Sequence, residues 1–543
     1  MKWPKIVTAA LITILSASLA TASPINIDLE DVAWEKRATS RAAKFGTAKK
    51  VRGVNLGGWF VLEAWMMPSF FTSDLVAKGA VDQWTYMTAV GDNTQALSLL
   101  KQHWSTWITQ DDFAQISAAG LNTVRIPVGH WTFNASSSEP YLASAEQPYI
   151  AQALLWAKQY SLDVVLDLHT APNSQNGFDN SGRQGAINFA KVTPTQNAAR
   201  VNSALVKMIQ LYVNNRQFGG VVKAIEILNE PACWSLGQDY MTSIHKAAYT
   251  ALRGAITSAA ITYPTTVIHD CFVQPLSKWQ STYSDTSFWK TSSMAIDTHR
   301  YQAWSPQNSY NFDQHISYTC GLASELSSAQ SSIRPTIVGE WSLAIGCTNC
   351  TFNSMADNIN AMNNATQNLF FRRFYEAQVT TYEQAGGWIF WNWKTQSRGD
   401  WSYQAAMAQG WIPKSPTTRV FQQTNSCPTT KLLSNVTFAT TSYPPVVNST
   451  SASNSTSTKT TTTTTSNTTT TTQSAAKRDG GLDLGNLLGP FAGANLNLTQ
   501  IIANGPKDPL ALGLQLIPST GRFLNIDAFP FIKKTTFATG PSH

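Results

Sequence analysis

Residues 224–234 are AIEILNEPACW, an apolar run that ends in an amide, a carboxylate and a proline. A run that is apolar on both faces is typical of a strand in a buried parallel sheet, and Pro231 lacks the backbone N–H that would extend the strand. The run therefore predicts a buried strand that carries Asn229 and Glu230 at its carboxyl end. Glu226 shares the strand face of Glu230 but would lie about 13 Å lower, so we expect it to be a buried structural residue.

Seven other runs of the same kind are spaced along the chain between residues 46 and 427. They lie at 52–60, 122–129, 162–169, 265–270, 294–301, 335–341 and 387–393. Segments with helical periodicity, such as 95–119, separate them. Eight buried strands that alternate with helices predict an α/β protein, with a (β/α)8 TIM barrel over residues 46–427.

Polar and aromatic side chains fall at or near the carboxyl ends of these runs. They are Arg125 in the second run, His169 in the third, Asn229 and Glu230 in the fourth, Asp270 in the fifth, His299 and Tyr301 in the sixth, Glu340 in the seventh, and Trp391 and Trp393 in the eighth. In a barrel the carboxyl ends of all strands lie on one face, where the following loops build the active site. The pattern therefore predicts one site that gathers these side chains.

Composition limits the class of ligand. Only 13% of the 543 residues are charged, and the net charge of +7 is spread along the chain rather than gathered into basic runs. This distribution argues against a nucleic-acid partner. The 19 tryptophans exceed what packing alone usually needs. Many aromatic rings with few charges suit a neutral, hydroxyl-rich substrate.

The sequence lacks the spacings of the common metal and cofactor sites. It contains no His-Glu-x-x-His, no tight His/Cys cluster, no GxGxxG, no P-loop and no serine elbow. We therefore expect neither a catalytic metal nor a cofactor. Taken alone, His169 and His299 would fit structural histidines, but their positions after strands favour a place in the site.

The start of the chain predicts a secreted protein. Lys2 and Lys5 precede a short apolar stretch, and residues 20–22 have the small side chains of a signal-peptidase site. We expect a signal peptide at 1–22 and a propeptide or N-terminal arm at 23–45, in which Lys36-Arg37 resembles a dibasic processing site. A membrane anchor is the alternative, although the apolar stretch is short and rich in Ser and Thr. Asn-x-Ser/Thr sequons along the chain fit secretion.

The composition changes after Cys427. Residues 428–478 are dominated by Ser, Thr and Asn, and such a segment cannot bury a core. It predicts a disordered, glycosylated linker. The tail at 479–543 follows a second dibasic pair, Lys477-Arg478, and lacks the apolar terminus of a lipid-anchor signal. We assign the tail no role.

Glu230 and Glu340 form a candidate catalytic pair. Glycoside hydrolysis needs one carboxyl group to protonate the leaving oxygen and a second to attack the sugar or activate water. Two carboxylates roughly 5 Å apart repel by about 3 kcal/mol at a dielectric of about 20, so one should stay protonated near neutrality. A cation beside one glutamate would decide which of the two stays protonated, and Arg125 is the candidate for that cation. For either glutamate alone, capping of the next helix is the alternative role.

Longer motifs carry a resemblance to a known family. They are RGVNLGGWFVLE, HWSTWIT, NTVRIPVGHW, DLHTAPNSQNGFDNSG, LNEP, DTHRYQ, VGEWS and GGWIFWNWKT, in this order between about residues 50 and 427. On these motifs the chain resembles glycoside hydrolase family 5, and within it the fungal exo-β-1,3-glucanases. The resemblance implies a retaining hydrolase in which Glu230 is the acid/base and Glu340 the nucleophile.

The resemblance also implies roles for the residues around this pair. Arg125 and Tyr301 would hydrogen-bond Glu340 and keep it ionised. Asn229 would bind the sugar 2-hydroxyl, and His299 would lie beside Glu230.

A closed substrate pocket is implied in the same way. His169 would line the subsite of the cleaved sugar and Trp391 would form its floor, with Trp393 as the alternative. The residues that would close the pocket around a terminal glucose, and so make the enzyme exo-acting, are Glu63, Asp179 and Asn180. Phe178 would be one half of an aromatic clamp for the next sugar. At the other half, where the family has Phe, this chain has Trp304, and a larger ring still stacks on a sugar.

Six cysteines in a secreted chain predict disulfides, and their connectivity stays open on spacing alone. For Cys347 and Cys350, which form a Cys-x-x-Cys just after the nucleophile strand, a structural bridge is favoured over redox chemistry. The resemblance implies a bridge from Cys320 to Cys427 that ties the end of the domain to the barrel. Cys233 with Cys271 would then join the loops after the fourth and fifth strands.

The sequence thus predicts a secreted or cell-wall-associated monomer that releases glucose from the non-reducing ends of β-1,3-glucan, with retention and some glucosyl transfer. The expected partner is a β-glucan polysaccharide or oligosaccharide, with no nucleic acid and no membrane span in the mature form. An endo-acting or β-1,6-preferring glucanase is the closer alternative. A non-catalytic wall-glucan-binding protein is the remoter one, and the presence of both glutamates with Arg125 and Tyr301 argues against it.

Overall fold

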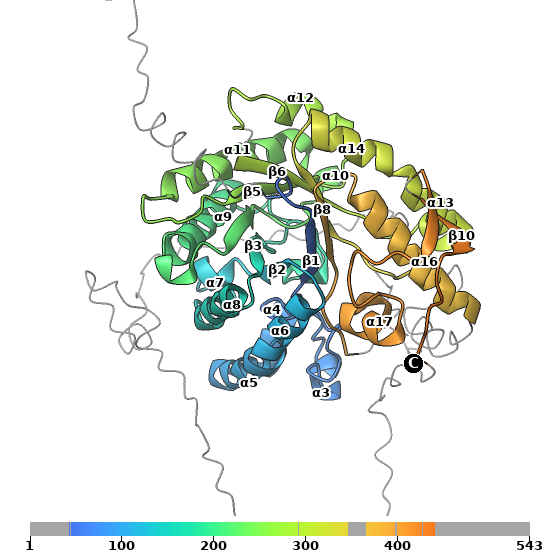
Figure 1. Ribbon diagram of the computed structural model, residues 1–543. Coiled ribbons are helices and arrows are strands. Elements are labelled where there is room, and N and C mark those ends of the chain that lie inside the picture. The colour runs from blue at the N-terminus through green and yellow to red at the C-terminus, as the bar shows by residue number, and fades with distance from the viewer. Residues whose placement is uncertain are drawn as a thin grey trace, which may run out of the picture. The chain divides into compact units, whose positions relative to one another are not determined.

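The computed structural model describes residues 43, 45–290, 293–345, 365–396, 399–425 and 427–439 of the 543-residue chain. Parallel strands close a barrel in the order β1 to β8, with β8 paired to β1 (Figure 1). The strands are β1 Val51–Asn55, β2 Thr123–Val128, β3 Asp163–Leu168, β4 Val222–Glu226, β5 Thr265–His269, β6 Met294–His299, β7 Thr336–Glu340 and β8 Gly387–Phe390. Each lies inside or overlaps one of the eight predicted runs, so the prediction of a TIM barrel is confirmed.

The barrel closes between β8 and β1, where the two backbones approach each other closely. Val51 pairs with Gly387, and Val54 pairs with Phe390. Gly387 has a φ of 125°, and a Cβ at this position would lie 2.0 Å from the carbonyl oxygen of Val51. Only glycine fits both the conformation and the contact. Any side chain here would push the closing strands apart.

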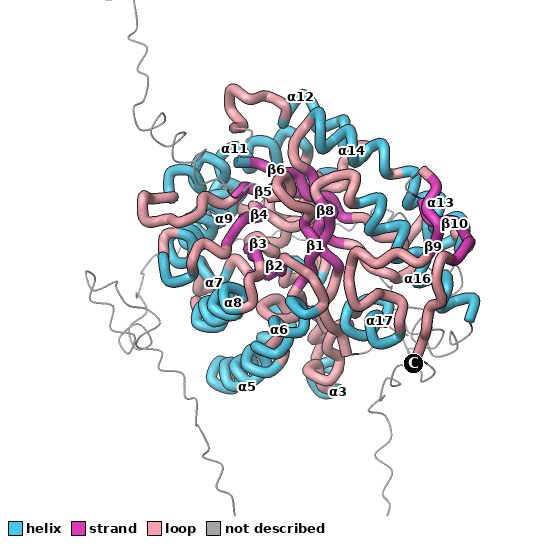
Figure 2. Tube along the Cα trace, viewed as in Figure 1, coloured by secondary structure: helices cyan, strands magenta, loops and turns pink. Residues whose placement is uncertain are grey.

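Helices follow the strands and pack around the barrel (Figures 1 and 2). The α-helices described are α3 Ser73–Ala77, α4 Gln83–Val90, α5 Asn93–Thr106, α6 Gln110–Ala118, α7 Trp131–Asn134, α8 Gln147–Gln159, α9 Pro194–Met208, α10 Cys233–Leu236, α11 Gln238–Ala255, α12 Gln280–Tyr283, α13 Phe312–Gly321, α14 Ala323–Ser332, α16 Ala365–Tyr382 and α17 Tyr403–Gln409. The helical pattern at 95–119 divides into α5 and α6, because the backbone N–H of Thr109 donates to the Asp112 carboxylate at 2.8 Å and starts a new helix.

The barrel interior has two chemically different layers. Toward the N-terminal ends of the strands lies an apolar layer, in which every member is at most 5% exposed: Phe45, Val51, Val165, Ala224, Val267, Ala295, Ile337 and Ile389. Toward the carboxyl ends lies a polar layer, whose fully buried members are Arg125, Asp167, Glu226 and Asp297. Because side chains alternate along a strand, Val165 and Asp167 share one face of β3, and Ala295 and Asp297 share one face of β6. Along each of these strands the inward face therefore carries an apolar side chain of the core first and a charged side chain nearer the carboxyl end.

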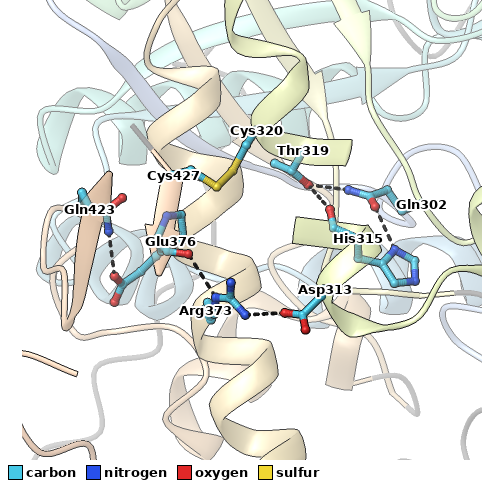
Figure 3. Close-up of a disulfide and its surroundings, with 10 residues drawn as sticks. Gln302, Asp313, His315, Thr319, Cys320, Arg373, Glu376, Gln423 and Cys427 are labelled. Atoms are coloured by element: carbon cyan, nitrogen blue, oxygen red, sulfur yellow. Dashed lines mark hydrogen bonds and ion pairs between the residues drawn. A yellow bond between two sulfur atoms is a disulfide. The ribbon is translucent and has the colours of Figure 1, made fainter. Parts of the chain in front are cut away.

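A disulfide joins Cys320 of α13 to Cys427, as the resemblance implied (Figure 3). The cysteines expected to form a second bridge, Cys233 and Cys271, are instead buried free thiols. They are hydrogen-bonded to each other, and burial together with the Cys233 thiol raises the pKa of Cys271 well above its ordinary value. This disfavours the thiolate that disulfide formation requires, so the expectation of a Cys233–Cys271 bridge is corrected. Cys347 and Cys350 lie outside the described residues.

Cys427 opens β10, Cys427–Leu432, which pairs antiparallel with β9, Phe421–Thr424. Helix α16 holds this hairpin: Arg373 donates to the carbonyl of Pro428 at 3.0 Å and to Asp313 of α13 at 2.7 Å (Figure 3). Folded structure therefore continues through Leu432, past the boundary predicted at 427.

The predicted signal peptide at 1–22 and the tail at 479–543 lie outside the described residues, as do most of the propeptide and of the linker. Within the described ranges, no helix is long and apolar enough to span a membrane.

Candidate active site

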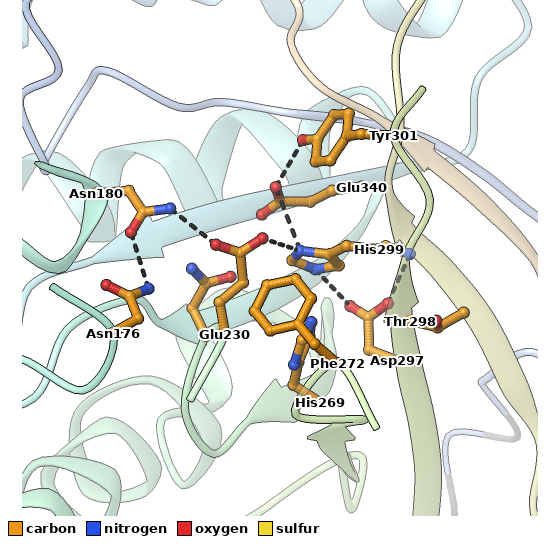
Figure 4. Close-up of polar contacts among 12 residues, drawn as sticks. Asn176, Asn180, Glu230, His269, Phe272, Asp297, Thr298, His299, Tyr301 and Glu340 are labelled. Atoms are coloured by element: carbon orange, nitrogen blue, oxygen red, sulfur yellow. Dashed lines mark hydrogen bonds and ion pairs between the residues drawn. The ribbon is translucent and has the colours of Figure 1, made fainter. Parts of the chain in front are cut away.

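The two glutamates of the candidate pair meet at the carboxyl ends of β4 and β7. Glu230 follows β4 and is 5% exposed, and Glu340 is the last residue of β7 and is 3% exposed. His299, the last residue of β6, lies between them: its Nδ1 is 2.7 Å from Glu230 Oε1 and 3.5 Å from Glu340 Oε2 (Figure 4). These two distances hold the carboxylate oxygens within about 6 Å of each other, close enough to act on one bond.

Strand β4 ends earlier than the sequence predicts. It stops at Glu226, and the chain then turns, so that Glu230 has a φ of 46°. A positive φ is uncommon for a residue with a side chain and marks a constrained turn. Because the strand does not continue, Glu226 is not about 13 Å below the site. Its carboxylate lies within 4.8 Å of ligand atoms of Asp297 and His299. Glu226 is buried as expected, but its predicted depth is wrong.

Arg125 of β2 is the centre of the polar layer. Its guanidinium donates to Glu340 Oε1 at 2.7 Å, to Asn229 Oδ1 at 2.8 Å and to Glu226 Oε2 at 2.8 Å. Asp167 Oδ2 lies 3.1 Å from the same group. Burial alone would lower the pKa of Arg125, but the surrounding carboxylates raise it well above its ordinary value. Arg125 is therefore a permanent buried cation in contact with Glu340.

Glu340 receives a second hydrogen bond, from the Tyr301 hydroxyl at 2.7 Å. The contacts that the resemblance implied for Arg125 and Tyr301 are thus both present. Burial raises the pKa of Glu340 above 4.5, although the charges of His299 and Arg125 oppose this rise. Burial and the neighbouring carboxylates also raise the pKa of Tyr301 well above 10, so Tyr301 stays a hydrogen-bond donor.

The pKa shifts around the pair favour a proton on His299. Burial would lower the pKa of His299, but Glu340, Asp297 and Glu230 raise it well above 6.5. For Glu230, burial raises the pKa, but the hydrogen bond and charge of His299 outweigh it and lower the pKa below 4.5. The sequence argument expected the two glutamates to differ in protonation, and their pKa values are shifted in opposite directions, up for Glu340 and down for Glu230. The raised pKa of His299 adds an imidazole between them that favours its protonated form. Glu230 and His299 share that proton across their 2.7 Å hydrogen bond.

His169 and Trp391 form one wall of the site. Their rings stack with centroids 5.6 Å apart and an interplanar angle of 10°. His169 Nδ1 lies 2.5 Å from Asp167 Oδ2, which fixes the orientation of the ring. Trp393, the alternative for the floor, lies elsewhere: it is fully buried and its indole N–H donates to Asp112 of α6 at 2.9 Å. We therefore keep Trp391 and withdraw Trp393.

Asn180 contacts the pair, and the buried carboxyl groups of Glu63 and Asp179 interact with it electrostatically. Asn180 Nδ2 donates to Glu230 Oε2 at 2.9 Å (Figure 4). Burial and the charge of Asp179 raise the pKa of Glu63 well above 4.5, and Glu63 accepts from the Trp65 indole at 3.0 Å. Burial raises the pKa of Asp179 to about 6. A raised pKa favours the protonated carboxyl group, which can donate to a sugar hydroxyl as well as accept from one.

The two halves of the expected aromatic clamp come from different loops. Phe178 lies beside Trp234, with ring centroids 6.4 Å apart. Trp304 packs against Tyr301 at 5.3 Å and Trp401 at 5.8 Å. Trp304 thus belongs to the Tyr301 side of the site, next to the hydroxyl that contacts Glu340.

Sequence reasoning missed three further residues of the site. Asp167 bridges Arg125 and His169, and Asp297 Oδ1 accepts from the Gly339 N–H at 2.6 Å. His269, which ends β5, accepts from the Cys271 N–H at Nδ1, and burial lowers its pKa well below 6.5, so it is neutral. The motifs DLH at 167–169 and DTH at 297–299 could have identified Asp167 and Asp297 from the sequence. In a strand the Asp and the His two positions later share a face, so both point into the barrel.

Two sets of three side chains bring their ligand atoms within 4.8 Å of one another. They are Glu230, His269 and His299, and Glu226, Asp297 and His299. In both sets protein cations already neutralise the carboxylates, because His299 bonds Glu230 and Arg125 bonds Glu226. A metal ion would have to compete with these cations. We therefore infer that the two sets serve to position Arg125, His299 and their carboxylate partners rather than to bind a metal.

Comparisons with known proteins agree with this geometry. The model of the family Cellulase (glycosyl hydrolase family 5) matches residues 87–397. A protein named probable glucan 1,3-beta-glucosidase A from Aspergillus fumigatus is 35% identical over 73% of this chain and 95% of its own length. A glucan 1,3-beta-glucosidase from Kluyveromyces lactis is 35% identical over 70% of this chain and 92% of its own. The crystal structure of rutinosidase from Aspergillus niger shares the fold at a TM-score of 0.54 and 19% identity, over 67% of this chain and 98% of its own.

A closed parallel barrel with two buried carboxyl groups at the carboxyl ends of its strands is the architecture of a barrel glycosidase. The chain belongs to glycoside hydrolase family 5, and it is a glycoside hydrolase.

Proposed function

We propose that the protein is a secreted, retaining exo-β-1,3-glucanase that releases glucose from the non-reducing ends of β-1,3-glucan and transfers some of it to other sugars. The observation that carries the retaining mechanism is the position of His299 between Glu230 and Glu340. Through His299 Nδ1, Glu230 Oε1 and Glu340 Oε2 are no more than about 6.2 Å apart, which is shorter than the roughly 6.5–9.5 Å separation of inverting glycosidases. The relatives named glucan 1,3-beta-glucosidase support β-1,3-glucan as the substrate.

In the first step Glu340 attacks the anomeric carbon and the bond to the leaving oxygen breaks. Arg125 and Tyr301 hold one carboxylate oxygen each, which orients Glu340 and keeps it ionised. Glu230 receives the proton of His299 along their hydrogen bond and passes it to the leaving oxygen, so Glu230 is a carboxylate when this step ends. The products are a glucosyl ester on Glu340 and a shortened chain.

In the second step Glu230 acts as the base. It takes a proton from water, which attacks the anomeric carbon and displaces Glu340. The second inversion restores the original configuration of the anomeric carbon. If a sugar hydroxyl replaces the water, the same step transfers glucose to that sugar. Arg125 holds Asn229 through Oδ1, and Asn229 Nδ2 lies 3.5 Å from His169 Nε2, so one of the two amide N–H groups is left to donate to the 2-hydroxyl.

The exo assignment rests on the group formed by Glu63, Asp179 and Asn180. Buried carboxyl groups beside the catalytic pair offer hydrogen bonds to the hydroxyls of a terminal glucose, and a longer chain would leave them without partners. His169 and Trp391 supply the ring wall against which the glucose packs.

We extend the proposal to the location of the protein. The N-terminal pattern supports cleavage of residues 1–22 and removal of a propeptide at 23–45, and the Ser/Thr-rich linker supports glycosylation outside the cell or in its wall. We propose that the mature enzyme acts as a monomer.

Hydrolysis of laminarin, a β-1,3-glucan, tests the proposal. We expect glucose as the first soluble product, and ¹H NMR should detect its β-anomer before mutarotation. Initial α-glucose would contradict the retaining mechanism. Early longer oligosaccharides would favour the endo-acting alternative, and faster hydrolysis of a β-1,6-glucan would favour the β-1,6 alternative. Binding of laminarin without turnover would favour the wall-binding alternative.

A further inference from the structure

Trp234 is the most exposed tryptophan in the described part of the chain, with 48% of its surface accessible. It lies in the short helix α10, Cys233–Leu236, which comes directly after Glu230 and Pro231 (Figure 1). The other tryptophans that the structure describes are buried or partly buried. An indole held in water beside a catalytic carboxylate, rather than packed in the core, indicates a surface for contact with a ligand.

Trp234 lies between two other aromatic rings. Its ring centroid is 6.4 Å from that of Phe178 and 5.5 Å from that of Phe272. Phe272 packs edge-on against His269, with centroids 5.0 Å apart (Figure 4). We name Phe178, Trp234 and Phe272 the outer aromatic row.

The outer aromatic row is attached to the elements that hold Glu230. Asn180, two residues after Phe178, donates to Glu230 at 2.9 Å. His269, against which Phe272 packs, has its ring centroid 4.3 Å from that of His299, the proton partner of Glu230. A general acid lies next to the leaving oxygen that it protonates. The row is therefore on the leaving-group side of the site.

We propose that Trp234 forms an outer subsite that stacks on the second glucosyl unit beyond the bond that is cleaved. The inference rests on the proposed function and on the family resemblance, which implies that Phe178 contacts the first such unit. Trp234 is the next ring in the row. Residues 231–238 carry no charge, which suits an uncharged pyranose whose C–H face packs on an aromatic ring. In glucosyl transfer the same subsite holds the acceptor.

The test compares two substrates in one variant. Laminaritriose reaches the outer subsite and laminaribiose does not. In Trp234→Ala we expect kcat/KM on laminaritriose, divided by kcat/KM on laminaribiose, to fall about tenfold, mainly through KM. Trp234→Phe should keep this ratio within about threefold, because a stacking ring remains. Ile261→Ala is the matched control, since Ile261 is also an exposed apolar residue, at 42%, but precedes β5 and so lies at the opposite end of the barrel.

A ratio in Trp234→Ala equal to that of the wild type would overturn the inference. If Trp234→Ala does not fold, ¹⁹F NMR of 5-fluorotryptophan-labelled Glu340→Gln provides the second measurement, with Trp234→Phe to assign the resonance. We expect the Trp234 resonance to move on addition of laminaritriose and not on addition of laminaribiose; an unmoved resonance overturns the inference. Failure of the proposed function is distinguishable, because the wild type would then hydrolyse neither oligosaccharide.

Discussion

The apolar layer and the polar layer of the barrel lie on the same strands, but they contribute differently to the protein. Ala295 and Ile337 are buried among other apolar side chains, and their burial stabilises the fold. Two or three residues further along, Asp297 and Glu340 are also buried but are charged, and burying a charge is unfavourable unless a partner compensates it. The barrel strands are therefore stabilised by apolar burial near their N-terminal ends, and they carry the charged groups of the active site near their carboxyl ends.

The largest expected effect comes from Glu340→Gln in the polar layer. Removing the nucleophile should lower kcat on 4-nitrophenyl β-glucoside by about 10⁴-fold or more, because the residual rate comes from binding alone. The thermal unfolding midpoint should stay the same or rise, since the variant removes one buried negative charge. Residual activity above about one part in a hundred in a correctly folded variant is incompatible with the assignment.

Arg125→Met should damage both the fold and the activity. It leaves Asp167, Glu226 and Glu340 buried without their cation, so we expect a loss of about 3–5 kcal/mol in the free energy of unfolding, together with a fall in kcat. Denaturant titration and steady-state kinetics measure the two effects.

Arg372→Met is the matched control for this variant. Arg372 is also a buried arginine, paired with Glu376 at 3.1 Å on α16, outside the barrel. It should lose stability but keep kcat. Equal losses of kcat in the two variants would show that Arg125 has no special place in the site.

The pH profile of kcat/KM should be bell-shaped. Glu340 must be ionised, and its pKa is raised above 4.5, so activity should fall as the pH drops through a value above 4.5. The proton on His299 must also be present. Because the pKa of His299 is raised well above 6.5, activity should persist beyond pH 6.5 and fall only when the pH exceeds that raised pKa.

His299→Gln sharpens this prediction. Without the imidazole, the carboxyl group of Glu230 must hold the proton itself, so the alkaline limb should move to lower pH by about one unit or more. An alkaline limb that stays in place would mean that His299 is not the proton holder.

The smallest effect is expected from Ile337→Val in the apolar layer. Loss of one methylene group should cost about 0.5–1.5 kcal/mol of unfolding free energy, read from denaturant titration. The value of kcat should not change, because the Ile337 side chain is buried in the apolar layer. A tenfold fall in kcat would show that the two layers are mechanically coupled.

The fold was predictable because each barrel strand is a short apolar run. The run at 335–341, for example, ends with Glu340, and β7 ends at that residue. The same logic found Arg125, His169 and His299, because parallel strands bring their carboxyl ends together.

The rest of the site depends on geometry that the pattern does not contain. The turn after Glu226 and the positive φ of Glu230 are set by the packing of the loop, so a straight-strand estimate misplaced Glu226. Trp391 and Trp393 are two positions apart just beyond β8, which ends at Phe390, so the sequence pattern does not distinguish them. The Asp112 partner of Trp393 comes from α6. Which group holds the proton depends on three carboxylates around His299, contributed by three strands or their ends.

The central claim is that Glu340 forms a covalent bond to the sugar while Glu230 and His299 manage the proton. Incubation with 2-deoxy-2-fluoro-β-glucosyl fluoride, followed by peptide mass spectrometry, tests it most directly, because the fluorine slows release of the glucosyl ester. We predict a fluoroglucosyl adduct on the peptide that contains Glu340, formed with loss of activity and absent from Glu340→Gln. An adduct on Glu230, or continued turnover of natural substrate with no adduct, would contradict the account.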